Sequence, residues 1–170
     1  MIKLTQTKRL KSYKPILEGL VEDFGYIYYH AILVWCGILD NSTPNDIWQV
    51  YLIKNDEETV GICGLYSLDQ KTIEELWLGW FGILPDMRNK GLGSEVLKQL
   101  EIEAIKMGAN YIYSYVDQEG KPLDFYYKNG FERIGTVNQY IESTNFKFDK
   151  ENFESLEDHV IKKKLDERSK

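Results

Sequence analysis

The stretch ILPDMRNKGLGSEVLKQL, residues 83–100, decides the fold because it joins the end of a strand to the start of a helix. It follows a run, TIEELWLGWFGIL at residues 72–84, which is apolar and almost free of charge after Glu75. Such a run predicts a central β-strand. After two glycines one residue apart, apolar residues recur at helical spacing up to Gly108. We therefore expect a strand, a tight glycine loop and an amphipathic helix in that order.

The loop between this strand and helix has the features of an anion-binding turn. Gly91 and Gly93 allow a close backbone approach and positive φ angles, so successive N–H groups can converge on an anion. The helix N-terminus adds partial positive charge, and Arg88 and Lys90 add full charges. The spacing fits neither a P-loop nor a dinucleotide fingerprint, which needs glycine where Val96 stands. Taken alone, two glycines after a strand are explained equally well by a tight turn.

Composition narrows the class of protein. A chain of 170 residues with 43% hydrophobic residues suits one domain, 1–170, with a core of about 1–165 and a frayed tail at 166–170. The formal charge of -6 argues against a nucleic-acid partner. Cys36 and Cys63 lie in apolar neighbourhoods, which predicts buried thiols in a reducing compartment.

The N-terminal segment carries no signal-type apolar core, and the longest apolar stretch, residues 26–39, is shorter than the ~20 residues that span a bilayer. We therefore expect a cytoplasmic protein without a membrane partner. His159 has no partner at any metal-ligand spacing, so no metal site is predicted.

Other segments predict a strand at 2–7, one or two helices within 12–39 and a β-hairpin over 48–68. Further along, the pattern predicts strands at 111–117, 131–137 and 159–165, with a short helix at 122–130. The expected fold class is therefore a mixed α/β sheet with helices on its faces.

Two motifs in register carry a resemblance to a known family. The loop Arg88-x-x-Gly91-x-Gly93 and the segment FYYKNGF at residues 125–131, about 30 residues later, resemble the two signature motifs of the Gcn5-related N-acetyltransferase (GNAT) family. The resemblance implies a mixed, mostly antiparallel central sheet flanked by helices on both faces. It also implies direct transfer of an acetyl group from acetyl-coenzyme A to a primary amine of a small molecule or peptide, by a monomer or homodimer. The alternative is a non-catalytic coenzyme A-binding regulatory or interaction module.

The same resemblance implies which residues contact the co-substrate. The strand would bind the pantetheine arm as an added strand would, and the loop would hold the pyrophosphate through backbone amides. The implied contacts are Phe81, Ile83, Arg88, Asn89, Lys90, Gly91, Leu92, Gly93, Ser94 and Tyr126.

Catalysis needs a base, because an amine with a pKa near 10 is protonated at neutral pH. Glu74 and Glu75 begin the central strand, where similar enzymes place a base, and strand alternation lets only one point into a cleft. We favour Glu75 slightly, and two solvated residues at a strand end remain an equal alternative. Tyr126 matches the family's tyrosine acid, which would protonate the leaving thiolate, with a packing tyrosine as the alternative. Gly79 and Gly82 predict a bulge that would free a backbone N–H near residues 81–83 for the oxyanion.

Overall fold

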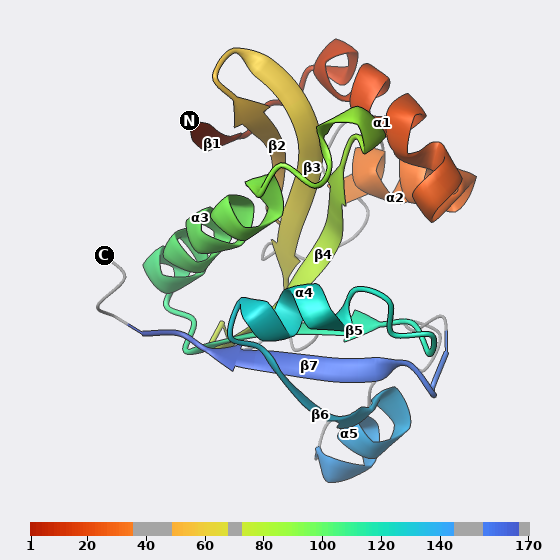
Figure 1. The fold of residues 1–170 in the computed structure, drawn as a ribbon, viewed down its shortest axis with the longest axis vertical. Helices are drawn as coiled ribbons and strands as arrows, with labels where there is room; N and C mark the ends of the chain where they lie inside the picture. Colours follow the sequence, from red (N-terminus) through yellow and green to blue (C-terminus); the bar gives the residue numbers. More distant parts are fainter. Residues whose placement is uncertain (36–48, 68–72, 145–154, 167–170) are drawn as a thin grey trace. The chain divides into compact units, whose positions relative to one another are not determined.

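The computed structural model describes residues 1–35, 49–67, 73–144 and 155–166 (Figure 1). The strands are β1 (Ile2–Thr5), β2 (Gln49–Asn55), β3 (Glu58–Tyr66), β4 (Glu75–Ile83), β5 (Tyr111–Val116), β6 (Glu132–Thr136) and β7 (His159–Lys164). The helices are α1 (Leu10–Phe24), α2 (Tyr26–Trp35), the 3₁₀ turn η1 (Pro85–Met87), α3 (Leu92–Met107), α4 (Leu123–Lys128) and α5 (Val137–Ser143).

Strand pairing follows the order β1-β2-β3-β4-β5-β7-β6. The β1–β2, β2–β3, β5–β7 and β6–β7 pairs are antiparallel, whereas β4 and β5 are parallel over three residue pairs. The predicted fold class, a mixed and mostly antiparallel sheet with flanking helices, is confirmed.

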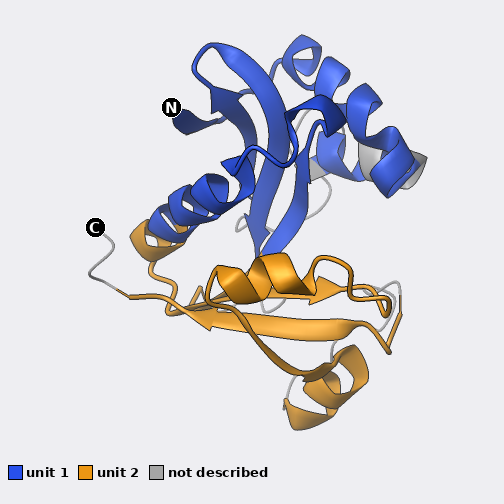
Figure 2. Cartoon of the chain, in the orientation of Figure 1, with its two compact units in different colours: residues 1–66, 78–103 blue, residues 67–77, 104–170 orange. Residues whose placement is uncertain are grey.

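The chain divides into two compact units, coloured separately in Figure 2. Unit 1 contains residues 1–66 and 78–103, and unit 2 contains residues 67–77 and 104–170. The division falls within β4, so each unit is assembled from two separate stretches of chain. That the chain acts as a single domain stays a prediction.

In unit 1, strand alternation sends side chains to helices on both faces of the β-sheet. Val50 and Leu52 of β2 join a buried cluster with α1 and α2. Tyr51, between them, faces the other way, where burial and the Glu103 carboxylate of α3 raise its pKa to about 12. Helix α3 and the α1–α2 pair therefore lie on opposite faces of this part of the sheet (Figure 1). The buried cluster comprises Tyr13, Ile16, Leu17, Leu20, Ile32, Leu33, Val50, Leu52 and Ile62.

Unit 2 repeats this arrangement around β5. Ser114 faces α4, because its side chain hydrogen-bonds Tyr126 of that helix. Tyr113 faces the opposite side, where its ring lies 5.7 Å from that of Tyr140 on α5. Helices therefore cover both faces of unit 2 as well.

The helical region, for which one or two helices were predicted, forms two, because Gly25 adopts φ 77° at the end of α1. Another helix differs from the sequence prediction. Helix α5 was not predicted, although Thr136 and Gln139 form a capping box at its start. That spacing of threonine and glutamine is a sequence signal for a helix N-terminus. Cys63 is buried as predicted, and Cys36 lies outside the described residues.

Candidate active site

The final residues of β4, which lie in unit 1, leave regular strand geometry. Trp80 has φ 52°, an unusual conformation for a bulky residue that costs on the order of 1 kcal/mol. Phe24 of α1 packs edge-on against its ring with centroids 6.0 Å apart. This irregularity lies between Gly79 and Gly82, where a bulge is predicted from the sequence. The side chains of Phe81 and Ile83, both predicted to contact the co-substrate, are half-buried.

The loop that follows has the backbone of an anion cradle. Asn89 and Gly91 have φ angles of 59° and 77°, and left-handed residues turn successive N–H groups toward one side. A Cβ atom built on Gly91 would meet no atom within 4 Å, so the space beside this residue is open. The N–H groups of Leu92, Gly93 and Ser94 begin α3, where the first turn has no intrahelical acceptors. The loop backbone therefore fits a phosphate group.

The two basic side chains of the loop, Arg88 and Lys90, have different surroundings. The Arg88 guanidinium makes an ion pair with Asp23 and donates from Nε to the Ile83 carbonyl at 2.8 Å. The Lys90 ammonium is exposed and lies 3.6 Å from the Met87 sulfur. Phosphate contacts at this loop would therefore come from the main chain and from Lys90.

In unit 2, the segment 125–131 fixes Tyr126 inside α4. The helix ends at Lys128 with Asn129 as its C-cap, and Gly130 with φ 84° lets the N–H of Phe131 bond back to the Tyr126 carbonyl at 3.1 Å. This closure packs the Phe131 and Tyr126 rings edge to face, with centroids 5.3 Å apart. Asparagine, glycine and phenylalanine in this motif thus have a local structural role, which is to hold the tyrosine in place.

The Tyr126 phenol remains protonated well above neutral pH. Burial raises its pKa to about 12, and the hydrogen bond with Ser114 acts in the opposite direction by stabilising the phenolate. The residue is 7% exposed, so little of it is accessible to solvent. A protonated phenol at this position is suited to donating a hydrogen bond or proton.

The two candidate bases have different environments. The Glu75 carboxylate accepts a hydrogen bond from the Tyr113 hydroxyl at 3.0 Å and another from Tyr140. Below it on the same face of β4, Trp77 stacks on Tyr113 with centroids 5.2 Å apart. Glu74 is exposed, and its main-chain carbonyl accepts from the N–H groups of Asn110 and Tyr111, while its carboxylate has no partner among the residues that the structure describes. Within that part of the chain, Glu75 is therefore the one of the two whose carboxylate is held in a fixed orientation.

The predicted residues thus fall into two sets. Unit 1 brings together the predicted co-substrate contacts on β4, the loop and α3, and unit 2 contains Glu74, Glu75 and Tyr126. Four residues that hold these side chains were not predicted: Asp23, Tyr113, Ser114 and Tyr140. Asp23 and Arg88 are 65 residues apart and Tyr113 and Glu75 are 38 apart, so no local pattern joins the partners.

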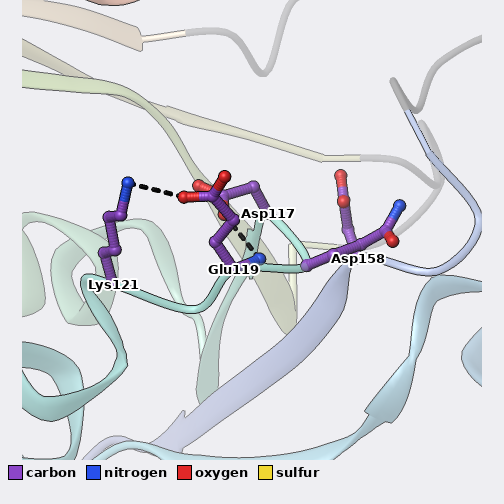
Figure 3. A pocket seen from close by; sticks show the side chains of 5 residues that line it. Asp117, Glu119, Lys121 and Asp158 are labelled. Carbon is purple, nitrogen blue, oxygen red and sulfur yellow. Dashed lines mark hydrogen bonds and ion pairs between the residues drawn. The ribbon is translucent and has the colours of Figure 1, made fainter.

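A shallow hollow in unit 2, next to the loop after β5, is lined by Asp117, Gln118, Glu119, Lys121 and Asp158 (Figure 3). Several of its charged groups have hydrogen-bond or ion-pair partners within the hollow. Asp117 accepts from the Glu119 N–H at 2.9 Å, and Lys121 pairs with the Glu119 carboxylate at 2.5 Å. Within the described ranges, no group of three or more histidine, cysteine or acidic side chains is arranged to hold a metal ion.

No helix in the described part of the chain combines the length and the apolar character needed to cross a membrane.

Solved acetyltransferases share the fold along nearly the whole chain. A GNAT family acetyltransferase from Elizabethkingia anophelis with acetyl-CoA bound is 16% identical, with 97% of both chains covered and a TM-score of 0.63. An aminoglycoside 6′-N-acetyltransferase complexed with coenzyme A is 15% identical, with 98% of this chain and 97% of that chain covered and a TM-score of 0.68. The first structure contains acetyl-coenzyme A, the co-substrate that the sequence predicts for this chain, and the second contains coenzyme A, which remains after the acetyl group is transferred.

One curated relative matches over a short segment. The tRNA(Met) cytidine acetyltransferase TmcA 2 of Saccharolobus solfataricus is 37% identical over 57 residues, which is 31% of this chain. The match spans only 7% of that protein's length. The acetyltransferase (GNAT) domain family matches residues 46–133, more than half of the chain and the part that contains β4, the glycine loop and Tyr126. The chain therefore belongs to the GNAT acetyltransferase family.

Proposed function

We propose that this protein transfers an acetyl group from acetyl-coenzyme A directly to a primary amine of a small molecule or peptide. The observation that carries the proposal is the loop after β4, with its two left-handed residues, Asn89 and Gly91, and the open space beside Gly91. A Cβ built at Gly91 would meet open space, so a phosphate group could approach the loop backbone at this position. The loop backbone and Lys90 would hold the pyrophosphate.

Glu75 is the proposed base. Acetyl-coenzyme A supplies a thioester carbonyl that an uncharged amine can attack, so the acceptor must first lose a proton. The Glu75 carboxylate would take that proton through water, because its partners Tyr113 and Tyr140 lie on the face of β5 opposite Ser114, the partner of Tyr126. Its hydrogen bonds from Tyr113 and Tyr140 support the choice over Glu74, because they fix its orientation.

Tyr126 is the proposed acid. As the nitrogen–carbon bond forms and the carbon–sulfur bond breaks, the thiolate needs a proton or a hydrogen bond. A phenol with a pKa of about 12 is a weaker acid than a thiol with a pKa near 8.5. Tyr126 would therefore act mainly by donating a hydrogen bond to the developing thiolate, and full proton transfer would require Ser114 to stabilise the phenolate.

The proposed acceptor is a cationic amine. A formal charge of -6 favours a cationic acceptor such as a polyamine, an aminoglycoside or a peptide amine. The aminoglycoside 6′-N-acetyltransferase with the same fold agrees with this class. We further propose a cytoplasmic protein, since Cys63 is a free buried thiol, acting as a monomer or homodimer.

The experiment has two stages. Acetyl-coenzyme A is titrated calorimetrically into the wild type and into Gly91→Glu, a change that puts a negative side chain into the open space of the loop. We expect micromolar binding to the wild type and none to the variant, whose fold is checked by circular dichroism. Thiol release is then measured with spermidine, an aminoglycoside and a lysine peptide. Binding without acetylation of any amine would favour the alternative, a coenzyme A-binding regulatory module, and absence of binding would reject both.

A further inference from the structure

The Arg88 side chain is held by residues outside its own loop. Its two terminal nitrogens bind both oxygens of Asp23 at 3.1 and 2.7 Å, and its Nε donates to the Ile83 carbonyl at 2.8 Å. The first contact reaches the last turn of α1, and the second reaches the last residue of β4. Arg88 therefore ties together the helix, the strand end and the loop, all within unit 1.

Tight packing between α1 and the end of β4 supports the same connection. A Cβ on Gly82 would lie 2.7 Å from the Phe24 ring and 2.9 Å from Leu20. On the helix side, a Cβ on Gly19 would lie 2.5 Å from the Leu84 side chain. Glycines on both partners thus permit a close approach. The end of α1 therefore packs against residues 82–84, which lead into the loop, and the Asp23–Arg88 ion pair adds a polar contact at the same place.

We propose that Asp23 is a positioning residue for the acetyl-coenzyme A loop, an inference that rests on the proposed function. By holding the Arg88 guanidinium, Asp23 fixes the exit of β4, so that the N–H groups of residues 89–94 keep the orientation that binds phosphate. A bidentate pair has a defined geometry. Both side chains are about one-third exposed, at 39% and 34%, so the pair contributes little to global stability and mainly to local order.

Simple electrostatics makes the opposite prediction, which gives the proposal a sharp test. A carboxylate beside an anion-binding loop repels phosphate, and it also occupies an arginine that would otherwise attract phosphate. On that view Asp23→Asn tightens coenzyme A binding. If Asp23 acts by positioning the loop, the same substitution weakens binding, because the ordered cradle is lost.

The variants are Asp23→Asn, Arg88→Gln, their combination and Asp23→Glu. The matched control is Glu22→Gln, which removes an exposed carboxylate next in sequence that has no ion-pair partner among the described residues. Calorimetry with coenzyme A should give about fivefold weaker binding for each single variant. The double variant should be no weaker than either single variant, Asp23→Glu should recover part of the affinity, and Glu22→Gln should match the wild type.

Hydrogen exchange in the ligand-free protein provides a readout that does not depend on activity. Amides of residues 84–94 should exchange faster in Asp23→Asn and Arg88→Gln, while those of β2 and β3 remain as in the wild type. Unchanged or tighter coenzyme A binding by Asp23→Asn would overturn the inference, as would additive losses in the double variant. Wild-type protein that binds no coenzyme A would reject the proposed function and this inference together. Normal wild-type binding with an unaffected Asp23→Asn would reject the inference alone.

Discussion

Tyr126 and Tyr127 are adjacent residues of α4 with opposite environments, and this makes them a matched pair for testing the acid. Tyr126 is buried and hydrogen-bonded to Ser114, whereas Tyr127 is 42% exposed. We expect Tyr126→Phe to lower kcat about 100-fold, because the thiolate loses its donor, and to change the KM for acetyl-coenzyme A much less. Tyr127→Phe should behave like the wild type in the same steady-state assay. A Tyr126→Phe enzyme within twofold of the wild-type kcat would assign Tyr126 to packing.

The two glutamates at the start of β4 allow a similar comparison. Glu75→Gln should lower kcat/KM for the amine about 100-fold near neutral pH, and the deficit should shrink as pH rises. The sign follows from the acceptor, because an amine with a pKa near 10 loses its proton to solvent at high pH and then needs no base. Glu74→Gln should stay close to the wild type, since its side chain is exposed. A larger defect in Glu74→Gln, or a deficit independent of pH, would contradict this assignment.

At the scale of elements, Gly91→Ala tests whether the glycine loop binds acetyl-coenzyme A, and Gly25→Ala is the matched control. Both glycines have φ 77° and open space where a Cβ would lie, but Gly25 only ends α1. Each substitution should cost about 1–2 kcal/mol of unfolding free energy, because alanine is strained at positive φ. Only Gly91→Ala should weaken acetyl-coenzyme A binding, by roughly tenfold or more, since its methyl group enters the phosphate cradle. Urea unfolding and calorimetry measure the two effects separately, and equal affinity losses would show that strain alone explains them.

The elements predicted correctly are those with local causes. The apolar run before Pro85, the glycines after it and the helical spacing beyond were enough to predict β4, the loop and α3 from local sequence. The insertion of β7 between β5 and β6 was not predicted, because pairing between strands far apart in sequence leaves no local pattern. The same reason hid the partners of Arg88 and Glu75. Sequence thus predicted the chemical groups of the proposed site, and the structure shows the residues that hold their side chains.

At the scale of the whole molecule, buried tyrosine and cysteine side chains in both units make the free energy of unfolding depend on pH in the alkaline range. Burial raises the pKa of Tyr51 and of Cys63 in unit 1, and of Tyr113, Tyr126 and Tyr140 in unit 2. The unfolded chain releases these protons near the ordinary values of 9.0 for cysteine and 10.0 for tyrosine. The folded protein keeps them to higher pH and so binds more protons in this window. The free energy of unfolding must therefore fall as pH rises above about 9.

Tyr126 offers the sharpest test of this linkage, because its pKa changes from 10.0 to about 12 on folding. Between those values one retained proton lowers the unfolding free energy by about 1 kcal/mol per pH unit. Urea unfolding of the wild type should give constant stability from pH 7 to 8.5 and a steady decline toward pH 11. Tyr126→Phe should be less stable at neutral pH, because it loses the hydrogen bond with Ser114. Above pH 10, however, its unfolding free energy should fall less steeply than that of the wild type, by about 1 kcal/mol per pH unit. Tyr127→Phe should keep the wild-type slope, and an unchanged slope in Tyr126→Phe would mean that this phenol does not retain its proton on folding.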